Sequence, residues 1–150
     1  MTAQAQAQAQ GKAQVNAQGK AQLPAKAEAK AKAKAKDELG RRGEALAVDF
    51  LRQLGCSVLA QNWRCSLGEI DVIVCDGTET VFVEVKTRSS VAFGHPLEAI
   101  TGEKLARLRR LAAVWCEAHP APNREIRIDA IAVIASPGEA PQLDHLRRIF

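Results

Sequence analysis

Two carboxylates and a lysine in this chain are spaced so that they could form a hydrolytic site. Asp71 precedes Glu84, Lys86 follows two positions later, and the segment between the acids has the pattern of two β-strands joined by a tight turn. Oxygen ligands hold hard divalent metals, and a cation stabilises the charge that develops on phosphorus during phosphodiester hydrolysis. These residue types therefore predict metal-dependent nuclease chemistry.

The register of this hairpin decides whether the two acids meet. The turn is either a two-residue loop of Gly77 and Thr78 or a four-residue loop from Asp76 to Glu79. Both pair the strands so that Asp71 lies directly opposite Glu84. Most of the face that would carry both acids is apolar, so we expect it to be covered by another element. Strand alternation places Ile70, Val72, Val74, Val81, Val83 and Val85 on one face, and Asp71, Ile73, Cys75, Phe82, Glu84 and Lys86 on the other.

A purely structural hairpin is the alternative interpretation. Charged residues on a strand commonly form its solvated face, and a Glu and a Lys two positions apart are frequent there. However, like charges directly across a strand pair destabilise it by a few tenths to about 1 kcal/mol, and burying a carboxylate without a partner costs more. The placement of Asp71 and Glu84 therefore favours a functional site over a structural one.

Apolar periodicity predicts the elements that would position these residues. Their order is helix, three strands, helix and two strands, which predicts an α/β fold with a mixed sheet flanked by helices. The expected elements are a helix from about Leu39 to Leu54, strands over Ser57 to Gln61, Ile70 to Cys75 and Val81 to Lys86, a helix from about Thr101 to Ala118, and strands over Arg127 to Ile134 and Leu143 to Phe150, with a polar connection from Asn62 to Gly68 and a loop from Thr87 to Pro96.

Charged residues on the two helices are further candidates. Glu44 extends the apolar stripe of the first helix, where a carboxylate needs a metal, a cation or backbone N–H groups. A favourable interaction with the helix dipole in the first turn is the alternative. Arg107 and Arg110 point away from the apolar face of the second helix, so they either contact phosphate or form a solvated surface.

Residues 1–36 differ in composition from the rest of the chain. They are almost wholly Ala, Gln, Lys and Gly, and their seven lysines and one glutamate give a net charge of +6. Because alternating Ala and Lys form no apolar stripe, we expect a disordered basic tail before a domain over residues 37–150. Such a polycation binds nucleic acid without reading its sequence. A solubilising leader and translation from an upstream start codon are the alternatives.

The sequence does not indicate a membrane protein, a secreted protein or a zinc-binding protein. No stretch reaches the roughly 18 apolar residues of a membrane span, and the N-terminus lacks an apolar signal core, so we expect a cytoplasmic protein. The four cysteines have no C-x-x-C spacing and no histidine in zinc-site register. They are expected to be small core residues, and none of the three histidines is assigned to catalysis.

With these pieces placed, the chain resembles the PD-(D/E)xK nuclease superfamily. It is most similar to the bacterial YraN family of predicted endonucleases, which are relatives of archaeal Holliday-junction resolvases. The resemblance covers about Gly40 to Phe150, and it departs from the superfamily pattern at Ile70, where a proline often precedes the first acid. The matching residues are Gly43 and Glu44, the string from Gly68 to Asp71, the string from Phe82 to Lys86, and Arg88, Phe93, Gly94, Lys104, Arg127 and Asp129.

The resemblance implies a restriction-endonuclease-like α-β-β-β-α-β core and an endonuclease that acts on branched or non-B DNA. It implies that Asp71, Glu84 and the carbonyl of Val85 hold Mg²⁺ or Mn²⁺, that Glu44 completes the site, and that Lys86 orients or activates the attacking water. A divalent ion would also offset the net negative charge of three acids against one lysine. The residues expected to contact DNA are Arg64, Arg88, Lys104, Arg107 and Arg110.

Partners follow from the same resemblance. Cutting paired strands in a DNA junction needs two sites, so a resolvase role implies a homodimer. Two alternatives to the enzyme stay open. One is a non-catalytic nucleic-acid-binding module whose lysine-rich tail supplies affinity. The other is an accessory subunit that works beside DNA-processing proteins such as a helicase or a recombinase.

Overall fold

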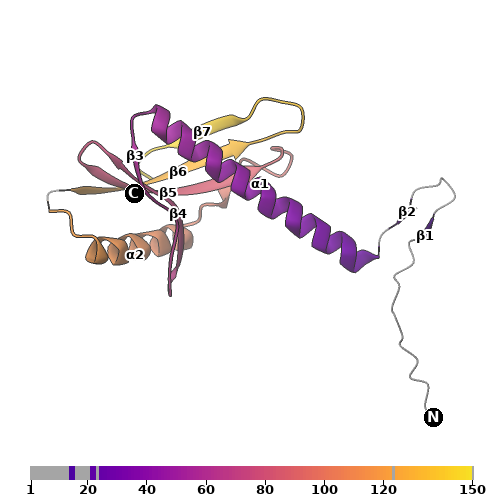
Figure 1. Ribbon diagram of the computed structural model, residues 1–150, viewed down its shortest axis with the longest axis horizontal. Helices are drawn as coiled ribbons and strands as arrows, with labels where there is room; N and C mark the ends of the chain where they lie inside the picture. Colours follow the sequence, from indigo (N-terminus) through magenta and orange to yellow (C-terminus); the bar gives the residue numbers. More distant parts are fainter. Residues whose placement is uncertain (1–13, 16–20, 23, 123, 150) are drawn as a thin grey trace, which may run out of the picture. The chain divides into compact units, whose positions relative to one another are not determined.

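The computed structural model describes residues 14–15, 21–22, 24–122 and 124–149. The chain divides into two compact units, Met1–Asp37 and Glu38–Phe150, and β1 pairs with β2 inside the first. The elements, in order, are β1 (Gln14–Val15), β2 (Ala21–Gln22), α1 (Ala25–Gln53), β3 (Ser57–Cys65), β4 (Gly68–Asp76), β5 (Glu79–Arg88), the 3₁₀ helix η1 (Pro96–Ala99), α2 (Gly102–Ala118), β6 (Glu125–Ile134) and β7 (Gln142–Leu146) (Figure 1).

The second unit is built on a five-stranded sheet in the order β3-β4-β5-β6-β7. Strands β5 and β6 pair in parallel, and the other neighbours pair antiparallel. Parallel neighbours need a long crossover connection, and the segment that contains α2 supplies it (Figure 1). The α/β class and the mixed sheet predicted from the sequence are confirmed.

The two helices cover opposite faces of this sheet. Val81 and Val83 of β5 belong to the core cluster that contains α1 residues, whereas Phe82 between them belongs to the cluster that contains α2 residues. Successive side chains of a strand point to opposite faces, so the clusters lie on either side of the sheet. The prediction that the face with Ile73 and Phe82 is covered is confirmed, since both side chains are fully buried under α2.

The hairpin of β4 and β5 has the predicted register. Val72 pairs with Val83, and the ladder continues to Asp76 opposite Glu79. The loop therefore has two residues, and its first, Gly77, adopts a φ of 59°. Glycine takes this left-handed conformation without the steric cost that other residues meet, which explains its place in the turn.

Strand alternation breaks next to Asp71, and here the sequence prediction for one residue was wrong. Ile70 was expected on the face of Val72 and Val74, but it packs with Ile73 in the cluster under α2. On the neighbouring strand β3, Asn62 has a φ of 49°. The ladder between β3 and β4 also skips both Asn62 and Asp71. Because of this local irregularity, Ile70 and Val72, which flank Asp71, point to opposite faces of the sheet.

Several element boundaries differ from the predicted ones. The polar connection expected from Asn62 to Gly68 is mostly strand, because β3 continues to Cys65 before a tight turn. As an edge strand, β3 carries polar side chains toward solvent, which masked it in the sequence. The last strand ends at Leu146, after which the backbone N–H of Arg148 binds the Asp129 carboxylate. Phe150 lies outside the described residues.

The first helix begins at Ala25 instead of near Leu39, so residues 25–36 are helical where a disordered tail was expected. Alanine and lysine both have high helix propensity, and this outweighs the absence of an apolar stripe. Most of residues 1–23 fall outside the described part of the chain, and the expectation of disorder there stays a prediction. Among the helices that the structure describes, none is both long and apolar enough to cross a membrane.

Candidate active site

The candidate site lies where β4 and β5 stop pairing. Their ladder ends at Val72 and Val83. One residue further, the Oδ2 atom of Asp71 accepts a hydrogen bond of 2.7 Å from the backbone N–H of Val85. The side chain of Asp71 thus takes a place that a backbone carbonyl would otherwise fill. The charge of Glu84 acts on Asp71, so the two acids lie close together, as the predicted register requires.

Glu84 is the most buried acid of this site. It is only 5% exposed, and its Oε1 atom contacts two ammonium groups. The Nζ atom of Lys86 lies at 3.3 Å and the Nζ atom of Lys104, from α2, at 2.5 Å. A buried carboxylate without such partners would cost several kcal/mol, and the two lysines offset this cost.

Glu44 reaches the same region from α1 because the helix packs very closely against β5. A Cβ atom on Gly43 would lie 1.8 Å from the Oγ1 atom of Thr87, so only glycine permits this approach. Glu44 follows directly and is half-buried. Its charge acts on Asp71, where it helps to raise the carboxyl pKa.

Asp71 has a carboxyl pKa well above the usual value. Burial, followed by the charges of Glu84 and Glu44, raises the pKa of Asp71 to about 7, against the opposing effects of the Val85 N–H and Lys86. Such a shift means that positive charge in the site does not compensate the negative charge on Asp71. Strongly shifted groups of this kind are enriched at functional sites.

The two lysines respond differently to the same surroundings. Burial opposes the charge on Lys86, but hydrogen bonding with Lys104 and the attraction of Glu84 hold its pKa above the usual value. Burial keeps the pKa of Lys104 below its usual value. The hydrogen bond to Glu84 raises this pKa, whereas the contact to Lys86 lowers it further. Lys86 is therefore the group that carries its proton more firmly.

The residues expected to contact DNA lie on three elements. Lys104 is inside the site and not on the surface. Arg64 on β3 is largely exposed and pairs with Glu69 at 2.9 Å. Arg88 is exposed at the end of β5. Arg107 and Arg110 are exposed on α2, and the side chain of Arg107 lies near the β3–β4 turn at Gly68. Of these five residues, all within the described part of the chain, only Lys104 forms an ion pair with a candidate acid.

The carboxylates do not form a closed metal cage in this structure. Among the described residues, no three His, Cys, Asp or Glu side chains gather closely enough to hold an ion together. The donor types nevertheless suit a hard divalent cation, since Asp71, Glu84, Glu44 and the Val85 carbonyl all offer oxygen. The raised pKa of Asp71 also indicates negative charge that such a cation would balance.

A second cluster of charges lies on the same sheet, and sequence reasoning gave it no role. Arg127 is 2% exposed and binds Asp129 and Asp76, each with a shortest contact of 2.9 Å, as well as Glu79. His145 binds Asp129 at 2.8 Å. Arg127 and Asp129 occupy alternate positions of a strand that is apolar from Ala130 to Ile134, and these two charges were the available signal. We call this set the Arg127 network; its members are Asp76, Glu79, Arg127, Asp129, His145, Arg147 and Arg148.

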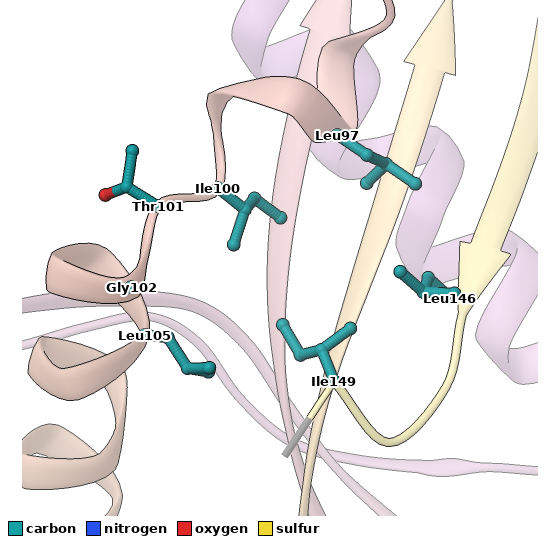
Figure 2. Close-up of a pocket in the computed structure, with 7 residues that line it drawn as sticks. All are labelled: Leu97, Ile100, Thr101, Gly102, Leu105, Leu146 and Ile149. Atoms are coloured by element: carbon teal, nitrogen blue, oxygen red, sulfur yellow. The ribbon is translucent and has the colours of Figure 1, made fainter.

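A separate apolar pocket of about 210 Å³ lies between η1, the start of α2 and the C-terminal segment (Figure 2). None of the residues that line it is an acid or a base, and Glu84 is not among them. Its lining residues are Leu97, Ile100, Thr101, Gly102, Leu105, Leu146 and Ile149.

Comparison with known proteins identifies the family of the chain. Residues 43–133 match the family model described as "Uncharacterised protein family UPF0102", a span that includes all the candidate acids and both lysines. A UPF0102 protein of Beutenbergia cavernae is 53% identical over 114 residues, which cover 76% of this chain and 97% of the relative. UPF0102 proteins of Paenarthrobacter aurescens and Nocardia farcinica are 52% and 47% identical, over 76% and 77% of this chain and 94% and 91% of the relatives. The chain belongs to the UPF0102 family.

Proposed function

We propose that the domain is a metal-dependent endonuclease that hydrolyses phosphodiester bonds in branched or other non-B DNA. The observation that carries this proposal is the Asp71 carboxylate held by the Val85 N–H beside buried Glu84 and Lys86. Crowding these acids costs stability, which a structural role would not justify. The resemblance to PD-(D/E)xK nucleases and YraN-type predicted endonucleases matches the same residues.

Each residue has a role that follows from its position. Asp71, Glu84, Glu44 and the Val85 carbonyl would hold Mg²⁺ or Mn²⁺, which when bound polarises a phosphoryl oxygen and lowers the pKa of water. The Val85 N–H orients the Asp71 carboxylate. Because the pKa of Lys86 is raised, its ammonium group is suited to orient water and meet phosphate charge, and less suited to abstract a proton.

The direct test is cleavage by the purified chain with Mg²⁺ or Mn²⁺ at fixed salt. The substrates are linear duplex, flap, single strand and four-way junction, assayed side by side. We expect Lys86→Ala and Asp71→Asn to reduce cleavage by about 10²-fold or more while thermal unfolding shows that both stay folded. Asp49→Asn, which removes an exposed acid from α1, is the matched control. Undiminished cleavage by the two site variants would assign the activity to a contaminant.

Two observations favour a second candidate, a nucleic-acid-binding module without catalysis. Glu84 is satisfied by two lysines, and the described residues contain no close group of three metal-ligand side chains. In that case DNA binding survives EDTA and Glu84→Ala but weakens when residues 1–36 are removed. Binding that instead requires the metal and Glu84 would exclude this candidate.

A further inference from the structure

Lys104 has a position that the sequence did not predict. It was expected on a DNA-contacting surface, but its Nζ atom lies 2.5 Å from the Oε1 atom of Glu84. This is the same oxygen that Lys86 approaches at 3.3 Å. The side chain of Lys104 is only 18% exposed. The residue therefore belongs to the interior of the candidate site.

The stability of α2 does not explain a lysine at this point. Thr101 caps the helix, and its Oγ1 atom accepts a hydrogen bond from the backbone N–H of Lys104 at 3.2 Å, so Lys104 lies in the first turn. The positive end of the helix dipole lies there, and it disfavours a cation. Moreover, burial of the side chain removes ammonium hydration. The attraction of Glu84 opposes both costs.

An ammonium group and a divalent cation cannot share one carboxylate oxygen at contact distance without strong repulsion. We propose that Lys104 occupies Glu84 in the metal-free protein and that a divalent cation must displace it, so that Lys104 weakens the metal affinity of the site. This inference rests on the proposed function, because it requires the metal to bind at Glu84. Lys104 is thus a positioning residue that controls when Glu84 is available to the metal.

Displacement has a consequence for the substrate. Lysine has a long flexible side chain, so an ammonium group released from Glu84 can turn toward solvent. Arg107, one helical turn further along α2, is exposed. The released Lys104 would add a cation beside it, where a DNA phosphate could bind. Metal binding would in this way free a phosphate-binding group.

The test measures Mn²⁺ affinity of the full chain directly, from the electron paramagnetic resonance signal of free Mn²⁺. We expect Lys104→Gln to bind Mn²⁺ on the order of tenfold more tightly than the natural protein, because one competing cation is gone. Lys104→Arg, which keeps the charge, should bind no more tightly than the natural protein. Arg109→Gln, which removes a positive charge from an exposed position of the same helix, is the control and should leave the affinity unchanged.

Glu84→Gln separates failure of this inference from failure of the proposed function. If Glu84→Gln weakens Mn²⁺ binding but Lys104→Gln leaves it unchanged or weakens it, the inference is overturned and the metal site stands. If the natural protein binds no Mn²⁺, or Glu84→Gln has no effect, both fail. Lys104→Met provides a second uncharged variant should Lys104→Gln unfold, as judged by thermal unfolding, and tighter binding by either variant supports the inference.

Discussion

The candidate site and the Arg127 network bury charges in the same sheet with opposite outcomes. In the network, Asp129 is held by His145, Arg127 and the N–H of Arg148, which together overcome the effect of burial and lower its pKa. In the site, Asp71 is buried beside two acids and has one N–H partner, and its pKa rises to about 7. Compensated charge indicates a structural role, whereas uncompensated charge indicates a site that awaits a ligand.

The network also has a clear mechanical role. Arg127 is buried among acids from three strands: Asp76 on β4, Glu79 on β5 and Asp129 on β6. Arg147 and Arg148 bring the chain after β7 to the same acids. The network therefore links the hairpin, strand β6 and the C-terminal segment. Its ion pairs hold these segments together, and this structural role accounts for the buried charges without a catalytic one.

The largest effect is expected from breaking the network at its centre. Arg127→Gln leaves Asp129 buried with fewer charged partners and should lower the free energy of unfolding by about 3–5 kcal/mol, as measured by urea unfolding at pH 7. Arg52→Gln, at an exposed pair of 3.6 Å on α1, is the control and should change it by less than about 1 kcal/mol. A small effect of Arg127→Gln would contradict the assignment of the network as structural.

A smaller effect of opposite sign is expected from Asp71. Its pKa is about 7 in the folded protein and near 3.8 when unfolded, so between these values only the folded state holds the proton. The free energy of unfolding should therefore fall as pH rises from about 4 to about 7. In metal-free buffer, Asp71→Asn should lack this fall and exceed the natural protein by on the order of 2 kcal/mol at pH 8.

Urea unfolding at pH 5 and pH 8 checks the Asp71 prediction, with Asp49→Asn as the control. Added metal reverses the expectation, because a cation bound to Asp71 would stabilise the natural protein and not the variant. The outcome that contradicts this prediction is a stability difference between the natural protein and Asp71→Asn that is the same at pH 5 and pH 8. It would show that the charge on Asp71 is already compensated.

The smallest effect is expected at the rim of the network. The side chain of Arg147 is 59% exposed and binds Asp76 at 2.8 Å. Solvent screens such a pair, so Arg147→Gln should cost no more than about 1 kcal/mol in urea unfolding. A loss as large as that of Arg127→Gln would mean that the exposed end of the network carries its stability, contrary to the burial pattern.

Local patterns predicted the parts of the site that are close in sequence. The two-residue turn at Gly77 set the register. This register places Asp71 near enough to Glu84 and Lys86 for their charges to act on it. The second helix was also predicted almost to the residue, since Thr101 is its cap and it ends at Ala118. These features depend on turn geometry and periodicity over a few residues, which a sequence displays directly.

Contacts between distant segments were not predictable in the same way. The irregularity at Asn62 and Asp71 moved Ile70 to the other face, although alternation alone gave no sign of it. The partner of Arg127 could not be chosen among many acids, because Asp76 and Glu79 are about fifty residues away in the chain. Burial decides which charges must pair, and burial is a property of the packed sheet.

By itself, the amino-acid sequence determined the α/β class, the hairpin and the placing of two acids and Lys86 at one point, because strand alternation and turn residues act locally. Only the tertiary structure decided that Lys104 faces Glu84 and that Gly43 lets α1 carry Glu44 close to β5. Both depend on how each helix packs on its face of the sheet. That packing results from side-chain fit across the whole core, so no short segment of the sequence predicts it.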